Sequence, residues 1–576
     1  MGLFNSSLHI GRSALLSYQS ALQTVGNNIS SAGSTDYTRL SPQLDPLNAP
    51  LRTGELQPGA GVALTGIQRN IDEALEARLR DAIGAHESGF SQQTALARIE
   101  SFLDDVNGTG VETQLRNFFS NFDQLQNRPE DSATRDLAIS SGQQLAGSLQ
   151  QLRQEFANLG FDLNAQIEDI VIVADEIAQK IGQLNGEIVT AEAGNFGQAT
   201  GLRDQRDGLL RDLAEIVDTT VREQDDGSVN VYIGSEALIQ GDFVRGLTTV
   251  EELDGEFVRT SIEFADTNGR IDIRGGQLHG LIVARDTYGY GQVQLVDDFS
   301  AAIIRDVNRV HANGQGLVGF DSVTASFDLA ATDQPLNNPA VGLQNLPESG
   351  SFFIVVTDDI SDTPVSHRIN VDFDTPGSET TLDSLVSDIN AQVEGVTASI
   401  SPGNRLTLTA DDGVTFTFGH DGEVAREDTS FLLASLGINT YFEGRDARDI
   451  RVADGLQEQP MFLAAATSNH DGDGTNASTL AALETTASDA LNGSTIREYY
   501  NALVGSVAVA SAAAREDLDA ASTVLASLEA QRENISGVNL DEETISMLKY
   551  ERAFQGVSRF VSVVDGLVSE LVALIR

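Results

Sequence analysis

Residues 1–29, MGLFNSSLHIGRSALLSYQSALQTVGNNI, decide how the rest of the chain is organised. Apolar or small side chains recur here in alternating steps of three and four residues, with Gly11 as the one weak position. This spacing predicts a helix with a continuous heptad seam, as in a coiled coil. The seam residues that we expect to contact a partner are Phe4, Leu8, Leu15, Tyr18, Leu22, Val25 and Ile29.

The C-terminal end repeats this pattern, which suggests that the two ends pair and that the residues between them are looped out. Its seam residues are Tyr550, Phe554, Val557, Val561, Val564, Val568, Leu571 and Ile575. A second apolar row on the same helix widens its face beyond what one partner helix covers. This row comprises Ile545, Phe560, Val563, Leu567 and Leu574. The row favours an assembly interface with several neighbours, although two amphipathic helices in the core of a monomer would also fit.

Composition narrows the class of protein. The 576 residues allow three or four domains, and the net charge of −49 makes binding to nucleic acid or to an anionic membrane unfavourable. Solubility alone would also explain the acidity. The absence of cysteine excludes disulfides, thiolate metal sites and cysteine nucleophiles. There is no apolar run of the length of a membrane span, and the N-terminus lacks the pattern of a cleaved signal peptide.

The sequence patterns between the two ends predict a multidomain α + β protein. Residues 71–193 have mainly helical periodicity, whereas residues 41–61 contain clustered prolines and read as an extended connector. Strand patterns appear near residues 217–274 and again in 320–430, and helix returns at 476–491 and 496–531. The predicted domains are a terminal coiled coil (1–42 with 536–576), a long-helix bundle (43–215, 275–320 and 436–535), and two inserted β-rich domains (216–274 and 321–435).

We find no pattern typical of an enzyme, a metal site or a cofactor site. The seven histidines are scattered without a second histidine at metal-ligand spacing, which favours ordinary surface or capping roles. Asp204 and Asp207 flank Arg203 and Arg206, and we interpret these residues as charge pairs on a helix surface. A subunit contact is the alternative for them. The sequence therefore predicts a protein that is not an enzyme.

Both termini resemble the motifs of bacterial flagellar axial proteins, the family that builds rod, hook and junction. The N-terminal motif includes Asn27, Asn28, Tyr37 and Arg39, and the C-terminal motif covers residues 539–555. Three internal stretches are similar to segments of the junction proteins of this family, and the resemblance is weak across residues 320–430. These stretches are residues 115–135, residues 201–207 with Asp204, Gln205, Arg206 and Asp207, and residues 436–444 with Asn439, Thr440 and Phe442.

The resemblance implies a structural protein at the junction between hook and filament. It implies unfolded export without a cleaved signal peptide, an extracellular location, and a tubular homo-oligomer assembled through the terminal helices. The implied partners are the hook protein, the second hook–filament junction protein, and an export chaperone that binds the C-terminal helix; nucleic acid and membranes are not among them. The alternatives are a hook- or rod-type axial protein, or a secreted adhesin or wall-active protein whose working segment is residues 320–430.

One stretch departs from the family pattern. The family has Thr-Pro-Gly before the tyrosine and Ser-Arg-Gln around the arginine. This chain has Ser34, Thr35 and Asp36 before Tyr37, and Thr38 and Leu40 on either side of Arg39. We expect Gly33 and Ser34 to keep the turn.

Overall fold

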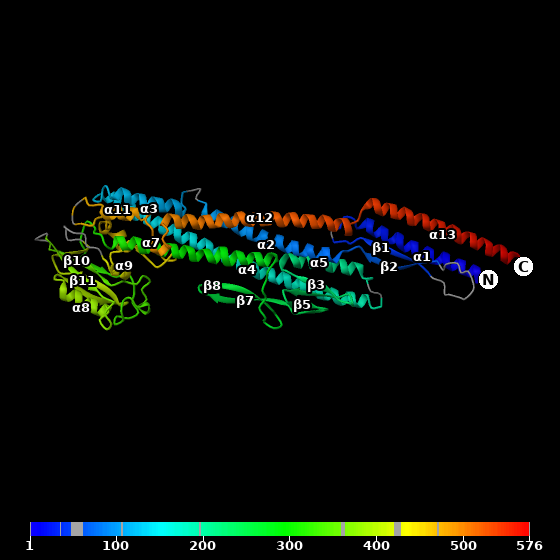
Figure 1. Ribbon diagram of the computed structural model, residues 1–576, viewed down its shortest axis with the longest axis horizontal. Helices are drawn as coiled ribbons and strands as arrows, with labels where there is room; N and C mark the ends of the chain where they lie inside the picture. The colour runs from blue at the N-terminus through cyan, green and yellow to red at the C-terminus, as the bar shows by residue number, and fades with distance from the viewer. Residues whose placement is uncertain are drawn as a thin grey trace. The chain divides into compact units, whose positions relative to one another are not determined.

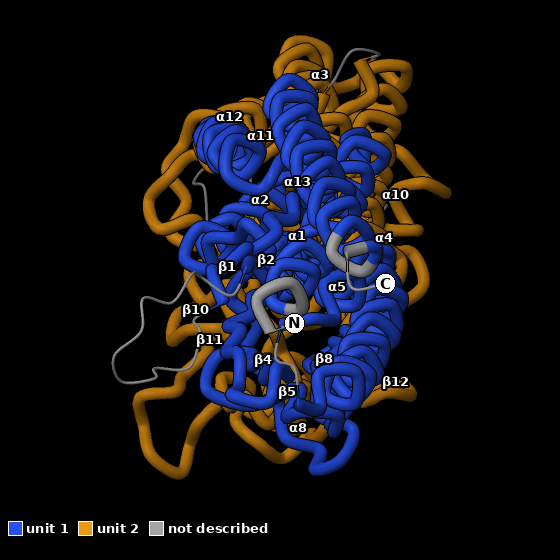
Figure 2. Tube along the Cα trace, turned by 90° about the vertical axis from the view of Figure 1, so that its right-hand side faces the viewer, with its two compact units in different colours: residues 1–95, 161–284, 512–576 blue, residues 96–160, 285–511 orange. Residues whose placement is uncertain are grey.

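The computed structural model describes residues 2–34, 36–47, 61–104, 108–194, 197–358, 363–419, 428–468, 470 and 472–574. It leaves out the side chains of residues 2–5, 571, 572 and 574, so Phe4, Leu571, Leu574 and Ile575 of the predicted interface lie outside the described side chains. The chain forms two compact units (Figure 2). Unit 1 comprises residues 1–95, 161–284 and 512–576, and unit 2 comprises 96–160 and 285–511. This division is coarser than the four predicted domains, whose boundaries stay predictions.

Long helices dominate the chain, and three of them contribute residues to both units. The segment from 132 to 191 forms one uninterrupted helix, in agreement with its unbroken apolar period and its lack of proline. The shared helices are α2 (Glu73–Leu103), α4 (Ser132–Ala191) and α12 (Ile496–Ser536). The other helices of unit 1 are α1 (Gly2–Ser30), α5 (Thr200–Ile216), α6 (Gly276–Val283) and α13 (Leu540–Leu574).

Unit 1 also contains three antiparallel sheets. The first is a hairpin of β1 (Leu40–Pro46) and β2 (Val62–Arg69), in part of the region that the sequence suggested was only an extended connector. Pro42 and Pro46 are compatible with β1 because an edge strand does not need every backbone N–H. A four-stranded sheet contains β3 (Thr220–Glu223), β4 (Val229–Ile233), β5 (Glu236–Gln240) and β6 (Phe243–Val244), and a separate hairpin contains β7 (Leu247–Asp254) and β8 (Phe257–Phe264).

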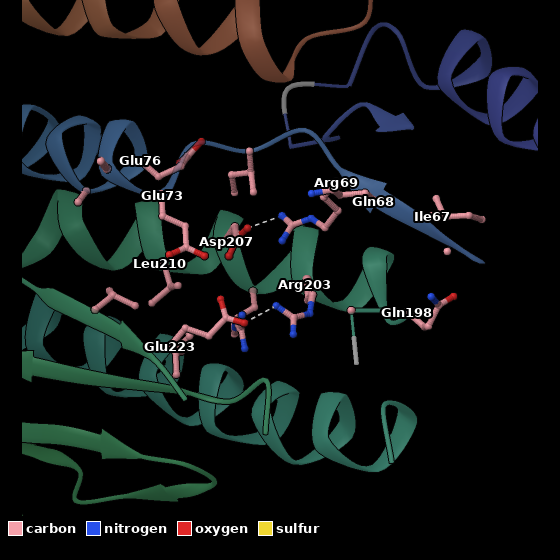
Figure 3. A pocket seen from close by; sticks show the side chains of 18 of the residues that line it. Ile67, Gln68, Arg69, Glu73, Glu76, Gln198, Arg203, Asp207, Leu210 and Glu223 are labelled. Atoms are coloured by element: carbon pink, nitrogen blue, oxygen red, sulfur yellow. Dashed lines mark hydrogen bonds and ion pairs between the residues drawn. The ribbon is translucent and has the colours of Figure 1, made fainter. Parts of the chain in front are cut away.

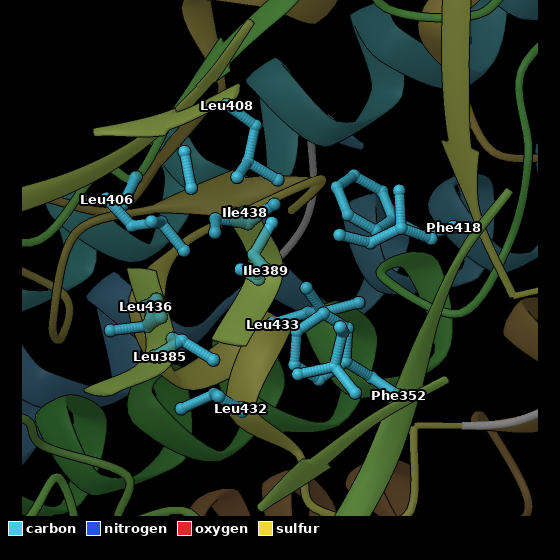
Figure 4. Close-up of a cluster of buried hydrophobic side chains, with 14 of the residues drawn as sticks. Phe352, Leu385, Ile389, Leu406, Leu408, Phe418, Leu432, Leu433, Leu436 and Ile438 are labelled. Carbon is cyan, nitrogen blue, oxygen red and sulfur yellow. The ribbon is translucent and has the colours of Figure 1, made fainter. Parts of the chain in front are cut away.

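The β-rich part of unit 2 has two three-stranded sheets around one apolar core. Phe352 and Phe418 lie on one sheet and Leu408 on the other, and Leu385 of a helix packs with them (Figure 4). A capping box at Thr381 starts that helix. The elements are β11 (Pro364–Val371), β10 (Gly350–Asp358) and β14 (Val414–Phe418); β12 (Val396–Ser401), β13 (Arg405–Ala410) and β9 (Ser322–Thr324); and α8 (Leu382–Gln392).

The rest of unit 2 is helical with short irregular segments. It comprises α3 (Val111–Leu125), α7 (Gly291–His311), α9 (Leu432–Leu436), α10 (Asp454–Glu458), α11 (Thr475–Ala482), the strands β15 (Phe442–Glu443) and β16 (Arg451–Val452), and short 3-10 turns at Pro339–Val341, Pro460–Phe462 and Asp489–Leu491. A π-helix (Ala284–Tyr290) precedes α7 and begins at the last residue of unit 1.

The prediction of one helix over residues 476–491 is wrong. Helix α11 ends at Ala482, and only a 3-10 turn follows it within that range. The hydroxyls of Thr485 and Thr486 both donate to the carbonyl of Ala482, at 3.3 and 2.8 Å. Such local side-chain bonds compete with helix propagation. Among the described residues, no helix combines the length and the apolar character that crossing a membrane requires.

Candidate assembly interface

Helices α1 and α13 lie side by side within unit 1 (Figure 1). The predicted seam of α13 faces α1: Val564 is buried, and Tyr550, Phe554, Val557, Val561 and Val568 are partly buried. The rings of Tyr18 and Tyr550 meet with centroids 6.4 Å apart. The predicted pairing of the two chain ends therefore matches the packing inside unit 1.

The seam of α1 differs from the prediction. Of the predicted positions with described side chains, only Val25 is fully buried, whereas Leu8, Leu15, Tyr18, Leu22 and Ile29 are partly exposed. The other fully buried positions of α1 hold small or polar residues: Gly11, Ala14, Ser17, Ala21, Thr24 and Asn28. Helix α1 contacts both α13 and the β1–β2 hairpin, and small side chains allow such close approaches.

Gly11 marks the closest approach of α1 to α13. A Cβ atom at this position would lie 2.4 Å from Cγ2 of Val561. On the other side of α1, the Ser17 hydroxyl accepts from the backbone N–H of Leu64 at 3.1 Å and lies 3.2 Å from the carbonyl of Val62. Gly11 is thus a contact point of the helix pair and not a defect in the seam.

The second apolar row of α13 is exposed. The exposed fractions of Ile545, Phe560, Val563 and Leu567 are 67, 43, 63 and 49%. Large apolar side chains on one helix face, next to a seam that is already covered, are typical of a surface that binds a further protein. This row is the part of the predicted interface that remains available in a single chain.

A polar cluster ties α1 to α13 beside the family motif. The side-chain amide of Asn28 donates to the carbonyl of Leu40 at 2.9 Å and to Oε2 of Glu543 at 3.0 Å. Its carbonyl oxygen accepts from the N–H of Leu40 at 3.0 Å and from the Tyr37 hydroxyl at 2.8 Å. Arg39 donates to Glu543 and to Glu542, at 2.8 Å each. Every hydrogen-bonding group of the buried Asn28 side chain is therefore used.

Three of the four N-terminal motif residues belong to this polar cluster. Asn27 is exposed and does not contribute its side chain. Burial, together with the nearby carboxylates of Asp204 and Glu543, raises the pKa of Tyr37 to about 12. Glu543 lies within the C-terminal motif, but the sequence does not identify it as the partner of Asn28 and Arg39, because the two ends are far apart in the chain.

The departures from the family pattern also make contacts in this region. Thr38 donates its backbone N–H to Asp204 at 3.4 Å, and Asp36 forms an ion pair with Arg211 at 2.9 Å. Leu40 provides both backbone groups that Asn28 binds. Thr35 lies outside the described residues.

The interpretation of residues 203–207 as surface charge pairs is wrong. Arg203, Asp204 and Arg206 are buried on α5, and Gln205 is the one exposed residue of 203–207. Asp204 and Asp207 both pair with Arg69 of β2, Asp204 at 2.8 Å. Burial raises the pKa of Asp204, and the Arg69 guanidinium opposes that rise. Their partner comes from another element, so the charges connect α5 to the hairpin.

The two arginines of the same motif connect α5 to the four-stranded sheet. Arg203 pairs with Glu192 at 2.8 Å and with Glu223 of β3 at 2.6 Å. Its hydrogen bonds lower the pKa of Glu192 to about 2. Arg206 donates to Asn185 Oδ1 at 3.1 Å and to the carbonyl of Gly227 at 2.7 Å. The motif is therefore an internal junction of unit 1.

The third motif, residues 436–444, lies inside unit 2. Asn439 adopts a positive φ of 51° and donates to the carbonyl of Gly314 at 3.0 Å, beyond the end of α7. Thr440 and Phe442 are buried. The ring of Phe442 meets those of Tyr441 and Phe118 at centroid distances of 4.7 and 5.7 Å. The motif residues are thus packed against the segment 115–135 that resembles the same family.

His311 is the residue of this region that sequence reasoning misjudged. It is wholly buried, whereas a surface or capping role was expected. Its Nε2 accepts from the N–H of Ala464 at 3.0 Å, so Nδ1 carries the proton and donates to the carbonyl of Asn439 at 2.8 Å. Burial lowers the pKa of His311 to about 4. A lone histidine after an apolar helix gave no signal for this role.

Within the part of the chain that the structure describes, no group of three or more His, Asp or Glu side chains is arranged to hold a metal ion. The charged groups of the clusters above form ion pairs and hydrogen bonds with one another, except that Nε of Arg206 has no partner among the described residues. Their chemistry is that of positioning and packing.

Comparison with known proteins identifies the family in agreement with these motifs. Residues 96–325 match the helical domain of flagellar hook-associated protein FlgK, residues 355–412 match the flagellin hook IN motif, and residues 530–574 match the C-terminal region of the flagellar basal body rod FlgEFG proteins. The match at residues 355–412 lies within residues 320–430, where the resemblance to the family was weak. These residues would be the working segment under the alternative of a secreted adhesin.

Relatives that match over nearly their whole length are flagellar hook-associated proteins as well. Flagellar hook-associated protein 1 of Escherichia coli K12 is 25% identical over 99% of this chain and 99% of its own. The protein of the same name from Bacillus subtilis is 22% identical over 98% of this chain and 97% of its own. The flagellar hook junction protein FlgK from Burkholderia pseudomallei has a similar fold, with a TM-score of 0.52 and 15% identity over 80% of this chain and 100% of its own.

These matches, in the interior and at the C-terminal end, define a flagellar axial protein with a structural role. The chain belongs to the family of flagellar hook-associated protein 1, the hook–filament junction protein of the flagellum. The match to the hook-associated helical domain argues against the alternative of a hook or rod protein.

Proposed function

We propose that the chain builds its junction by self-assembly, with α1 and α13 entering a tube in which neighbouring subunits cover the exposed row of α13. The observation that carries this proposal is the exposure of Ile545, Phe560, Val563 and Leu567 beside a seam that α1 already covers. Burial of one such side chain contributes roughly 1.5–3 kcal/mol. Several per subunit offset the entropy of fixing two long helices only when neighbours complete the burial.

Unfolded export is the second part of the proposal. An export chaperone would cover the apolar face of α13 before assembly, because this face promotes aggregation in water. The absence of cysteine supports it, since refolding outside the cell then needs no disulfide formation. The proposed contacts after export are the hook protein on one side and the second hook–filament junction protein on the other.

Two variants test the assembly proposal. Deletion of residues 557–576 should leave the rest of the chain folded by circular dichroism, yet abolish motility and incorporation into the flagellum. The double variant Phe560→Ser and Leu567→Ser should have the same effect without shortening the helix. Val524→Ser is the matched control, since Val524 is also exposed (53%) but lies on α12. A motile strain carrying either α13 variant would overturn the proposal.

A further inference from the structure

A cleft of about 690 Å³ opens in unit 1 beside the motif of α5 (Figure 3). Its walls are residues 65–69 of β2, the first turns of α2, the inner side of α5 and the edge of β3. This volume lies within the range of about 300–1,000 Å³ that is typical of binding sites. Apolar side chains, among them Ile67, Leu210 and Val221, alternate with charged ones along the walls.

The arginines of the cleft are not equally satisfied. Figure 3 shows Arg69 directed at Asp207 and Arg203 directed at Glu223, and both arginines form ion pairs with these carboxylates. The Nε atoms of Arg80 and Arg206 are buried too, yet they have no hydrogen-bond partner among the described residues. Burial lowers the pKa of both guanidinium groups. Carboxylates nearby, among them Asp207, partly offset this effect, but neither group forms an ion pair among the described residues. Burying a charged group without an ion-pair partner is costly, so these two groups favour a ligand that brings negative charge.

The acids of the cleft do not meet this need. Asp207 binds Arg69, Glu223 binds Arg203, and Glu76 accepts from Arg532 at 2.9 Å and from Arg211 at 3.4 Å. Glu73 also lines the cleft but its side chain is exposed. Neither Arg80 nor Arg206 is therefore paired with a carboxylate of the cleft.

Strand β2 also offers backbone groups on the cleft side. Within the described residues β1 is its one strand partner. On the opposite edge the Ser17 hydroxyl of α1 binds the backbone at Val62 and Leu64, so the part of that edge without a partner is at residues 67–69. Ile67 lies opposite Pro42, which has no N–H, and Arg69 lies opposite Leu40, whose backbone groups bind Asn28. The N–H and C=O groups of Ile67 and Arg69 therefore point away from β1. An open edge of this kind binds an extended segment by strand addition.

The β7–β8 hairpin has the complementary chemistry. Its tip, residues 250–256, has the sequence VEELDGE, and Leu253 is 78% exposed. The strand β7 has an open edge of its own, since the hairpin forms a two-stranded sheet. The ion pair between Glu252 and Arg270 is exposed and therefore easily exchanged. No residue of this hairpin lines the cleft of its own chain.

We propose that the cleft binds the acidic β7–β8 tip of a second copy of this chain. Glu251 would meet Arg80 and Arg206, and Leu253, on the same face of β7, would enter the apolar wall. The strand would extend β2 along the free part of its edge. Arginine suits this role because its planar guanidinium binds a carboxylate through two parallel hydrogen bonds. This contact is a lateral one between subunits and does not depend on the terminal helices.

A peptide assay with the full chain tests the contact. A fluorescent peptide of residues 247–257 is titrated with the protein at low ionic strength, and binding is followed by anisotropy. Arg80→Gln should weaken binding about tenfold, which corresponds to the loss of one charge-assisted hydrogen bond. Arg78→Gln is the matched control, because Arg78 is exposed on the same helix and does not line the cleft. It should change the affinity less than twofold.

Three further measurements separate the explanations. A peptide with Glu251→Gln and Glu252→Gln should bind as weakly as the normal peptide binds the Arg80→Gln protein. Charge reversal in both, Arg80→Glu with Glu251→Arg in the peptide, should restore part of the affinity. The protein lacking residues 557–576 should bind the normal peptide unchanged, so a failure of the assembly proposal would leave this result intact. Equal affinity for the normal and glutamine peptides, or full displacement by inorganic phosphate at the same ionic strength, overturns the proposal.

Discussion

Two regions of this molecule carry family motifs and treat their apolar side chains in opposite ways. In unit 2, Phe442 and Tyr441 of the motif at residues 436–444 are wholly buried among aromatic rings. In unit 1, Phe560 and Leu567 of α13 remain exposed beside the seam with α1. A closed core stabilises the chain by itself, whereas an exposed row does so only when another chain covers it. Residues such as Phe442 therefore stabilise the fold of a single chain, whereas residues such as Phe560 are available for contacts with a second chain.

The largest expected effect comes from exchanging one phenylalanine in each region. Phe442→Ala should lower the free energy of unfolding by about 3–5 kcal/mol, because it leaves a cavity in a closed core. Phe560→Ala should lower it by less than about 1 kcal/mol, since that ring is already 43% exposed. Urea unfolding followed by circular dichroism measures both. Similar losses in the two variants would contradict the distinction between the regions.

The buried imidazole of unit 2 predicts that the stability of the chain depends on pH. The pKa of His311 falls from 6.5 to about 4 on folding, so the unfolded chain binds more protons between these values. Stability should therefore decrease as the pH falls from 6.5 towards 4, by up to about 3 kcal/mol from this group.

Comparison of variants isolates this contribution. His311→Gln should flatten the pH dependence of the urea midpoint between pH 7 and pH 4, whereas His9→Gln, at an exposed position of α1, should not. An unchanged slope in His311→Gln would show that other groups control the acid sensitivity.

The ion pairs of the polar cluster should have an intermediate effect, confined to unit 1. Glu543→Gln removes a charge whose side chain is 3% exposed, and it weakens contacts with both Arg39 and Asn28. We expect a loss of about 2 kcal/mol. Hydrogen exchange of α1 and α13 should accelerate while the amides of unit 2 do not change. Glu542→Gln is the control, because Glu542 binds the same arginine but is 58% exposed.

The smallest effect is expected at the position that departs from the family pattern. Asp36 pairs with Arg211, but its side chain is 64% exposed. Asp36→Asn should therefore change the free energy of unfolding by less than about 0.5 kcal/mol, as is usual for exposed ion pairs. Thermal unfolding in low salt is sensitive enough to detect a larger value, which would mean that the altered turn stabilises the terminal helices.

The sequence predicted well whatever depends on local periodicity. The seam of α13, its second apolar row and the helical character of residues 71–193 all follow from repeats of three and four residues. These repeats did not decide that residues 132–191 form one helix. The same reasoning misplaced the seam of α1. Its large side chains form the apolar pattern, but its small residues face the closest neighbours, and periodicity does not say which neighbour approaches more closely.

Features that depend on distant partners were not predictable in this way. Arg203 and Arg206 look like the charged face of a surface helix until Glu192, Glu223 and Asn185 are brought beside them. The β1–β2 hairpin was obscured by the prolines of the same stretch, which indicate an extended chain but not its pairing. His311 lacked any neighbour in sequence that would mark it as a core residue.

The burial of Tyr37 near Asp204 and Glu543 has a consequence for chemical reactivity. A free tyrosine is half ionised near pH 10, whereas the pKa of Tyr37 is raised to about 12. Its phenol therefore stays protonated, and a poor nucleophile, in media alkaline enough to convert an unshifted tyrosine to phenolate. Reagents that acylate phenolate ions should modify such tyrosines first and Tyr37 late. Early modification of Tyr37 would then report that the junction of α1 with α13 has opened.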